Sequence, residues 1–329
     1  MDKISVIGSG SWATALVKIF TENKCKVNWY VRRSHVAKQI NESGRNPNYI
    51  SYLTLDVDYL EASSNLEEIV RSSDYVLFAL PSAFVADLVG KLDPEIFKSK
   101  KILVSIKGMV SKTNQTPLAF ILDQLRLNPE DAIVLGGPCH AEEIAQSRKT
   151  YMTIAGKDSQ LIKEVLPSFQ STYIQLQRSG DIWGIEYAAI YKNVVGVACG
   201  IAKGLNYGDN FQAVLVANAI EELTKLLDLL IAPEQTLNSS SYLGDLLVTG
   251  YSNLSRNRTF GELIGRGYNT PDAERAMSMV AEGYYAVKGL YPLIEKDIND
   301  FPILSTVYRI IYNNISPFTE FKLLEKKLR

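Results

Sequence analysis

The chain has 329 residues, which is longer than one hydrophobic core usually grows, so about two domains are expected. Its 35 basic and 36 acidic residues nearly cancel, and the formal net charge of −1 argues against a nucleic-acid partner held by bulk electrostatics. Three widely spaced cysteines without a C-x-x-C pair argue against a disulfide framework and against a zinc or other metal site.

The sequence also shows no sign of export or membrane insertion. No segment reaches the roughly 18 consecutive apolar residues of a membrane span. The N-terminal sequence MDKISVIGSG lacks the long apolar stretch and the cleavage site of a signal peptide. We therefore expect a cytoplasmic protein without a membrane span.

Short apolar runs and helical patterns alternate through the first half of the chain. The predicted strands are the runs at 3–7, 26–31, 74–80, 101–106, 131–137, 150–156 and 172–177. Helical spacing is found between them, for example at 11–23, 63–73 and 117–127. Strands that alternate with helices predict βαβ units and a largely parallel sheet.

From about Asp181 the pattern changes, because strand-like runs become rare and long helical segments such as 211–230 take over. The turn-like cluster RSGD at 178–181 marks the predicted boundary. The expected fold class is α/β, with a Rossmann-type, doubly wound sheet over residues 1–180 and an all-α domain over residues 181–329.

The segment VIGSGSWATAL contains the pattern G-x-G-x-x-A at Gly8, Gly10 and Ala13, between a predicted strand and a predicted helix. The first glycine permits a tight turn, the second lets a pyrophosphate approach the backbone, and the small alanine allows close packing of helix and strand. The free N–H groups at the start of the helix then face the phosphates. This context predicts a dinucleotide site that includes both glycines.

Arg32 and Arg33 stand at the end of the second predicted strand, where NAD-specific sites usually have an acidic residue. Arginine suits a 2′-phosphate, so the sequence favours NADP(H) as the cofactor, with NAD(H) possible. Two solvated loop arginines are the alternative interpretation.

Two further predicted strands end in polar or turn-forming residues. Lys107 and Gly108 follow the run at 101–106, at the edge of the sheet where ligands bind, although a surface lysine at a turn is equally compatible. In GGPCHAEEIA, a turn leads into a helix expected to begin around Cys139. His140 is a candidate acid, but a histidine in a first helical turn is more often a cap or packing residue.

The segment 242–261 holds the other dense polar cluster. Asp245 precedes an apolar run, and SRNR presents Ser255, Arg256, Asn257 and Arg258 just before a predicted helix. A hydroxyl, a guanidinium group and an amide grouped in this way form a good phosphate receptor. A polar loop that caps the helix is the alternative.

Lys192 and Asn193 interrupt the otherwise apolar or small-residue stretch YAAIYKNVVGVACGIA at 187–202. Lysine is seldom fully buried without a partner. Burial and a nearby positive charge lower the pKa of a lysine toward neutrality, where it serves well as a general acid. A lysine whose stem follows the apolar surface to solvent is the alternative.

Taken in order, seven elements resemble the bacterial-type, NAD(P)-dependent glycerol-3-phosphate dehydrogenases. They are GSGSWATAL, the pair at 107–108, GGP-x-x-A-x-E, KNV, GDL, SRNR-x-FG and V-x-E-G at 280–283. The resemblance implies reversible hydride transfer between NAD(P)H and dihydroxyacetone phosphate, which gives sn-glycerol 3-phosphate for glycerophospholipid synthesis. It also implies a homodimer, and it makes residues 1–180 the dinucleotide-binding domain and residues 181–329 the substrate-binding domain.

The resemblance further implies a role for each matching residue. Lys192 becomes the catalytic proton donor to the carbonyl oxygen, and Lys107 contacts both cofactor and substrate. The other implied substrate contacts are Gly137, Cys139, Asp245, Ser255, Arg256 and Asn257. The implied cofactor contacts, besides the turn glycines, are Ser11, Trp12, Arg32, Arg33, Ala141, Arg256, Val280 and Glu282.

The chain departs from the family pattern at a few positions, which bear on substrate affinity more than on reaction class. The departures are Ala13 for the third glycine, Cys139 and His140 for Ser or Thr and Phe, Ala188 and Ala189 for two glycines, Asn218 for arginine, and Gly250 for cysteine. A thiol at position 139 is a weaker hydrogen-bond donor than a hydroxyl.

Two other functions are compatible with parts of the pattern. Another two-domain β-hydroxyacid dehydrogenase, acting on a carboxylate or an acyl thioester, would explain the glycine turn and Lys192, but not SRNR after GDL. A non-catalytic NADPH-binding sensor would explain the turn, but not a lysine in an apolar stretch.

Overall fold

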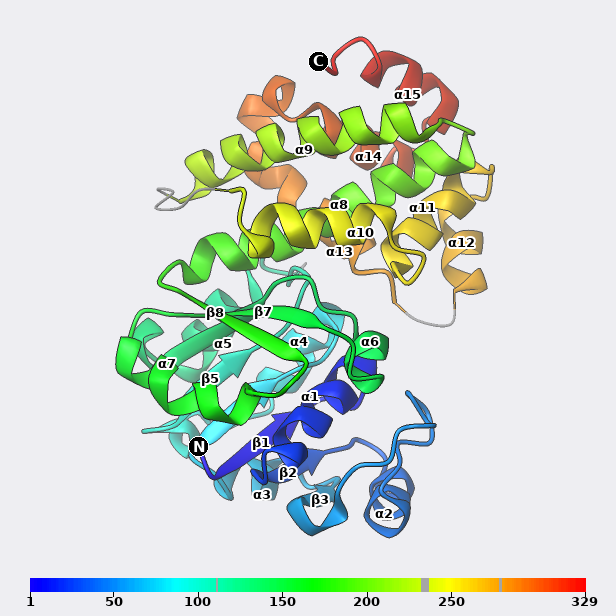
Figure 1. Cartoon of the computed structure of the whole chain (residues 1–329). Helices are drawn as coiled ribbons and strands as arrows, with labels where there is room; N and C mark the ends of the chain where they lie inside the picture. Colours follow the sequence, from blue (N-terminus) through cyan, green and yellow to red (C-terminus); the bar gives the residue numbers. More distant parts are fainter. Residues whose placement is uncertain (111, 232–236, 278–279) are drawn as a thin grey trace. The chain divides into compact units, whose positions relative to one another are not determined.

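A single β-sheet organises the first half of the chain (Figure 1). The computed structural model describes residues 1–110, 112–231, 237–277 and 280–329, and within them eight strands lie in the order β3-β2-β1-β4-β5-β6-β7-β8. Their bounds are Lys3–Ile7 (β1), Lys26–Tyr30 (β2), Leu60–Ser63 (β3), Tyr75–Phe78 (β4), Lys101–Val104 (β5), Ala132–Gly136 (β6), Thr150–Gly156 (β7) and Ile174–Ser179 (β8). Neighbours from β3 to β6 pair in parallel, β6 and β7 are antiparallel, and β7 and β8 are parallel.

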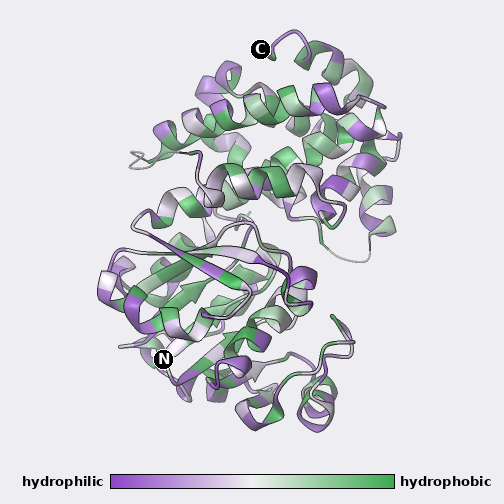
Figure 2. Cartoon of the chain, viewed as in Figure 1, coloured by the Kyte–Doolittle hydropathy of each residue, from purple (hydrophilic) through white to green (hydrophobic). Residues whose placement is uncertain are grey.

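Helices connect these strands and cover the sheet. They are α1 (Ser11–Glu22), α2 (Ser34–Ser43), α3 (Leu66–Arg71), α4 (Val85–Val89), α5 (Pro117–Leu125), α6 (Ala141–Ala145) and α7 (Ser159–Val165). One buried cluster joins α1, α2, α6 and α7 to the sheet and includes Leu16, Phe20, Trp29 and Ile144. The central strands β1, β4, β5 and β6 are mostly hydrophobic along their length (Figure 2), as expected for parallel strands that helices cover, whereas β2, β3 and β8 also carry several polar residues.

From α8 onward the strands and helices assigned to the described residues are all helices, so the predicted fold class is confirmed. The helices are α8 (Ile182–Gly204), α9 (Asp209–Leu230), α10 (Asp245–Tyr251), α11 (Arg256–Gly265), α12 (Thr270–Ala276), α13 (Glu282–Leu290), α14 (Pro302–Tyr312) and α15 (Pro317–Leu324). A π-helical turn at Ser240–Gly244 leads into α10, and a 3₁₀ segment at Tyr291–Asp300 links α13 to α14.

Three differences separate the predicted elements from the observed ones. Strand β3 was not predicted, because its four residues, LEAS, carry too short an apolar pattern. Several strands end early, as at Val104, after which the chain leaves the sheet. The helix expected around Cys139 begins only at Ala141, because His140 has extended backbone angles and serves as its N-cap residue.

Glycines bring α8 and α11 into backbone contact. A Cβ atom at Gly200 would lie 2.1 Å from the Arg258 carbonyl oxygen, and one at Gly261 would lie 2.1 Å from the Val197 carbonyl oxygen. Any side chain at these positions would push the helices apart. The stretch that carries Lys192 is therefore packed directly against the helix that begins with SRNR.

A buried carboxylate joins α9 to α14. Glu222 is 3% exposed and accepts hydrogen bonds from the backbone nitrogens of Ile303 and Leu304 at 2.8 and 2.9 Å. Burial raises the pKa of Glu222 to about 7, although these hydrogen bonds oppose the increase. The helix start is thus capped by a group that titrates close to neutral pH.

The chain forms two compact units. The sheet unit comprises Met1–Leu80, Phe84–Ile106 and Pro117–Ile182. The helical unit comprises the described residues of Pro81–Ala83, Lys107–Thr116 and Trp183–Arg329. Two short segments that follow β4 and β5 therefore contribute to the helical unit, and Lys107 lies in one of them.

None of the helices in the described part of the chain combines the length and the apolar character that crossing a membrane would need.

Candidate functional site

The glycine turn between β1 and α1 has the geometry of a dinucleotide phosphate site. Gly8 has a φ of +128°, and a Cβ atom there would lie 2.1 Å from the Ala79 carbonyl oxygen, so the turn needs glycine. At Gly10, the N-cap residue of α1, a Cβ atom would have no described neighbour within 4 Å apart from adjacent residues. The backbone at the start of a 12-residue helix is therefore open to an anion, and the turn fits a dinucleotide.

Other predicted cofactor contacts of the sheet unit lie near the ends of strands. Ser11 and Trp12 open α1, and the Trp12 indole nitrogen donates a hydrogen bond to Ser105 Oγ at 2.7 Å, just beyond β5. Arg32 and Arg33 follow β2 with exposed side chains, and Arg33 is the N-cap residue of α2. Exposed guanidinium groups at this position suit a 2′-phosphate.

The turn after β6 holds the next group of predicted residues. Gly137 has a φ of +100°, and a Cβ atom there would lie 2.8 Å from the Tyr151 carbonyl oxygen. The Cys139 thiol donates to the Gly137 carbonyl oxygen at 3.2 Å. His140 and Ala141 begin α6, a helix of only five residues. The thiol thus makes a local contact within the turn.

Three charged side chains meet in the helical unit. The Lys192 ammonium group on α8 donates to Asp245 Oδ1, and Lys107 Nζ lies 3.7 Å from Asp245 Oδ2. Their side chains are 9%, 3% and 18% exposed for Lys192, Asp245 and Lys107. We call these three residues the lysine cluster. These residues are far apart in the sequence: Lys107 follows β5, Lys192 lies within α8, and Asp245 begins α10.

Asp245 changes the electrostatic setting expected for Lys192. Burial disfavours a charged lysine, which was the basis of the sequence prediction, but the adjacent carboxylate favours the charged form. A buried pair of this kind depends on both partners, because a single uncompensated charge is costly. With two ammonium groups around one carboxylate, the cluster can hold a proton and still attract an anion.

A chain of amide groups extends from the lysine cluster. The Asn193 side-chain nitrogen donates to the Lys107 carbonyl oxygen, and the Asn257 side-chain nitrogen donates to Asn193 Oδ1 at 2.7 Å. Asn257 Oδ1 then accepts from the Gly283 backbone nitrogen at 2.8 Å. Asn193 and Asn257 therefore position the backbone beside the cluster, and Asn193 is a residue to which the sequence analysis assigned no role, although it adjoins Lys192.

The start of α11 presents the SRNR residues. Ser255 is its N-cap residue, and its hydroxyl oxygen accepts from the Arg258 backbone nitrogen at 3.3 Å, as the capping alternative predicted. The Arg256 side chain is exposed, with Nη1 3.5 Å from the Val280 carbonyl oxygen. A capped helix start with an adjacent guanidinium group retains the chemistry of a phosphate receptor.

Glu282 is held by a residue that sequence analysis did not single out. Its two carboxylate oxygens accept from the Ser82 backbone nitrogen at 2.9 Å and from the Ser82 hydroxyl at 2.5 Å. A Cβ atom at Gly108 would collide with Glu282 Oε2. Burial raises the pKa of Glu282, while the Ser82 hydrogen bonds and the charge of Arg256 oppose this. The pairing of Ser82 and Glu282 spans 200 residues, so no local signal could have revealed it.

The predicted residues thus fall into two groups. The helical unit holds Lys107, Lys192, Asp245, Ser255, Arg256, Asn257, Val280 and Glu282. The sheet unit holds Gly8, Gly10, Ser11, Trp12, Arg32, Arg33, Gly137, Cys139 and Ala141. Among the described residues, no group of three or more His, Cys, Asp and Glu side chains is placed to hold a metal ion.

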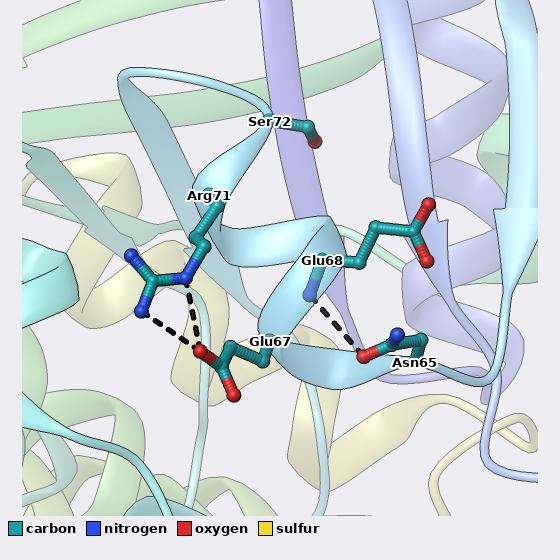
Figure 3. Close-up of a pocket in the computed structure, with 5 residues that line it drawn as sticks. All are labelled: Asn65, Glu67, Glu68, Arg71 and Ser72. Atoms are coloured by element: carbon teal, nitrogen blue, oxygen red, sulfur yellow. Dashed lines mark hydrogen bonds and ion pairs between the residues drawn. The ribbon is translucent and has the colours of Figure 1, made fainter.

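A surface cavity of about 460 Å³ lies along α3 and is lined by none of these residues (Figure 3). The Arg71 guanidinium group donates to Glu67 Oε1 at 2.9 and 2.8 Å, and Asn65 Oδ1 accepts from the Glu68 backbone nitrogen at 3.3 Å. Each of these pairs joins residues about one helical turn apart. The contacts are typical of a solvated helix.

Two family models match the chain. The model described as NAD-dependent glycerol-3-phosphate dehydrogenase N-terminus matches residues 3–162. The model described as NAD-dependent glycerol-3-phosphate dehydrogenase C-terminus matches residues 181–322. The two matches cover both halves of the sequence in their expected order.

Individual proteins show the same similarity along nearly the whole chain. A glycerol-3-phosphate dehydrogenase (NAD(P)+) of Staphylococcus aureus is 32% identical over 317 residues, which are 96% of this chain and 95% of that protein. The crystal structure of glycerol-3-phosphate dehydrogenase from Coxiella burnetii has a TM-score of 0.91 at 26% identity and covers 98% of each chain. A Plasmodium falciparum glycerol-3-phosphate dehydrogenase shares the fold, with a TM-score of 0.85 at 22% identity over 97% of this chain and 94% of its own.

Proposed function

Because the chain belongs to the family of NAD-dependent glycerol-3-phosphate dehydrogenases, we propose that it transfers a hydride between NAD(P)H and dihydroxyacetone phosphate to give sn-glycerol 3-phosphate. The observation that carries this function is the lysine cluster, in which the Lys192 ammonium group is buried and paired with Asp245. A buried, oriented ammonium group is what a ketone reductase needs beside the carbonyl oxygen.

Lys192 acts as the general acid. Ketone reduction adds a hydride to the carbonyl carbon and a proton to the oxygen, and the bound NAD(P)H supplies the hydride. Lys192 donates the proton, and in the oxidative direction it accepts the proton from the alcohol. Asp245 orients the ammonium group of this lysine, while the Lys107 charge stabilises negative charge that develops on the oxygen.

The phosphate of the substrate binds at the start of α11. Arg256 offers an exposed guanidinium group, and Ser255 offers its hydroxyl hydrogen while its oxygen caps the helix. Asn257 positions this site, because its amide nitrogen donates to Asn193 and its amide oxygen accepts from the Gly283 backbone nitrogen. Gly137 and Cys139 are the further substrate contacts that the resemblance implies.

The sheet unit binds the dinucleotide through Gly8, Gly10 and the start of α1. Arg32 and Arg33 receive the 2′-phosphate, so NADP(H) is preferred and NAD(H) is also used. The remaining cofactor contacts are Ser11, Trp12, Lys107, Ala141, Arg256, Val280 and Glu282. Residues 1–180 form the dinucleotide-binding domain, and residues 181–329 form the substrate-binding domain.

The cellular setting follows from the reaction. A cytoplasmic homodimer that reduces dihydroxyacetone phosphate would supply sn-glycerol 3-phosphate for glycerophospholipid synthesis. Sedimentation of the purified protein tests the dimer, since a monomer at micromolar concentration would contradict it.

Activity is tested by mixing the purified protein with NADPH and dihydroxyacetone phosphate and following the loss of NADPH absorbance. We expect turnover with the phosphate ester and little with unphosphorylated dihydroxyacetone, because the latter cannot use Arg256. Turnover of a 2-oxo acid, but not of the phosphate ester, would instead favour another β-hydroxyacid dehydrogenase. Binding of NADPH without turnover of either substrate would favour a non-catalytic sensor.

A further inference from the structure

The three carbonyl groups of the glycine turn 8–10 each accept a hydrogen bond from a side chain. The Trp29 indole nitrogen donates to the Gly8 carbonyl oxygen at 2.5 Å. The Asn46 amide nitrogen donates to the carbonyl oxygen of residue 9 at 3.1 Å, and the Thr14 hydroxyl donates to that of residue 10 at 3.0 Å. Three consecutive peptide groups are thus held by donors from three different segments.

All three donors are buried. Trp29, Asn46 and Thr14 are 0%, 1% and 1% exposed, and they come from β2, the loop after α2, and α1. The Asn46 amide nitrogen also donates to Thr14 Oγ1 at 2.9 Å, so two of the donors are linked. Buried donors cannot swing away to solvent, so each helps to orient the carbonyl that it binds, and the Gly10 carbonyl also accepts from the Thr14 backbone nitrogen at 3.0 Å.

The loop that carries Asn46 is itself closed by hydrogen bonds. The Leu55 backbone nitrogen donates to the Gly44 carbonyl oxygen at 2.7 Å, which joins the two ends of the loop. Asn46 Oδ1 accepts from the Asn48 backbone nitrogen at 3.1 Å, which orients the amide toward the turn. Asn46 is thus held by its own loop as well as by its contacts with the turn and with Thr14.

Because each peptide group is planar, these contacts also determine the direction of the neighbouring N–H groups. In a planar trans peptide the C=O and the following N–H point in opposite directions. Holding the carbonyls of residues 8–10 toward the buried donors therefore turns the N–H groups of Ser9, Gly10 and Ser11 the other way. A run of oriented backbone N–H groups is an anion-binding concavity, whereas a carbonyl rotated to that side would repel a phosphate.

We infer that Trp29, Asn46 and Thr14 are positioning residues that preorganise the turn for the pyrophosphate of the dinucleotide. This rests on the proposed function, because it takes NAD(P)H as the ligand. The benefit is that the peptide groups are ordered before binding, so the ligand does not have to order them. None of the three residues touches the ligand in this role.

Calorimetric titration with two probes tests the inference. NADPH carries a pyrophosphate, whereas adenosine 2′-monophosphate has the adenosine and the 2′-phosphate without it. We expect Asn46→Ala to weaken NADPH binding about tenfold, and Thr14→Val and Trp29→Phe about threefold to fivefold, with binding of adenosine 2′-monophosphate unchanged. Thr14→Ser, which keeps the hydroxyl, should bind NADPH like the wild type.

Matched variants separate positioning from general loss of stability. Thr21→Val removes an equivalent hydroxyl-to-carbonyl hydrogen bond in the same helix, to Val17 at 3.0 Å, and Asn28→Ala removes another buried amide, which donates to Ser72. Both should bind NADPH like the wild type, even where urea unfolding shows that they are less stable.

Two results would overturn the inference: unchanged NADPH binding in Asn46→Ala, or equal weakening of both probes. A wild-type protein that binds no NADPH would instead contradict the proposed function. The two failures are therefore distinguishable in one set of titrations.

Discussion

The glycine turn of the sheet unit and the lysine cluster of the helical unit handle charge in different ways. The turn offers backbone dipoles whose carbonyl ends are already paired with buried side chains. The cluster holds ionised side chains, two ammonium groups around one carboxylate, each less than one-fifth exposed. Paired dipoles tolerate the loss of one contact, whereas a buried charge that loses its partner remains uncompensated. We therefore expect larger effects from changes in the cluster, and on turnover rather than on cofactor binding.

The largest effect is expected for Lys192→Ala. Loss of the general acid should lower kcat about 10³-fold, within the usual range for this type of catalysis, while NADPH binding stays near that of the wild type. Steady-state assays and calorimetric titration measure the two quantities. Lys203→Ala is the matched control, because Lys203 lies on the same helix and pairs with Glu262 at 2.8 Å. Near-normal turnover in Lys192→Ala would remove this residue from the mechanism.

The second effect concerns stability and pH. The pKa of Glu222 is raised from its ordinary value of 4.5 to about 7 by burial, so the folded protein binds more protons than the unfolded chain between these pH values. The contribution of Glu222 to stability therefore falls as pH rises from about 4.5 to 7, by up to about 3 kcal/mol, and is constant above that. Urea unfolding at pH 5 and pH 8 should show a smaller difference for Glu222→Gln than for the wild type. Parallel pH profiles would contradict the assignment.

Asp245→Asn should have the next largest effect. The change leaves Lys192 and Lys107 close together without their shared carboxylate, and we expect kcat to fall about 10²-fold as the proton donor loses its orientation. Kinetics with dihydroxyacetone phosphate measure this. The control is Asp272→Asn, which affects an exposed pair with Arg275 and should leave kcat unchanged. If Asp245→Asn retains full turnover, the cluster does not depend on its central charge.

A smaller effect, on binding alone, is expected for Gly10→Ala. The added methyl group meets no described neighbour within 4 Å, so it projects into the space that the dinucleotide needs. NADPH should bind about tenfold more weakly, with the free energy of unfolding changed by less than about 1 kcal/mol. Gly180→Ala, which also has open space, is the control for calorimetry and unfolding. Unchanged NADPH binding in Gly10→Ala would argue against this turn as the phosphate site.

The smallest effect is expected for the double change Arg32→Ala and Arg33→Ala. Because both side chains are exposed, their removal should leave stability unchanged. NADPH binding should weaken about fivefold to tenfold while NADH binding stays the same, since only the former has a 2′-phosphate. Equal weakening for both cofactors would mean that the arginines act on a part common to the two molecules.

Much of the fold was predictable because the signals are local. Apolar runs bounded by turn residues located seven of the eight described strands, and the 3.6-residue period located α9. The edge strand β3 escaped because its pairing with β2, and the Asn41 amide group that binds both backbone groups of Ala62, are tertiary contacts. Short elements of this kind carry too little sequence pattern to stand out.

The functional site shows the same division between local sequence signals and tertiary contacts. The sequence by itself determined the glycine turn, because G-x-G allows backbone conformations and close approaches that other residues cannot make. It also marked Lys192 as unusual, because a charged side chain is costly among apolar residues. Only the tertiary structure decided which charge stands beside Lys192, that Asn257 faces Asn193 and Gly283, and that Trp29 and Asn46 hold the turn. These partners are 21 to 64 residues apart in sequence, and such pairings depend on how helices and strands pack rather than on local spacing.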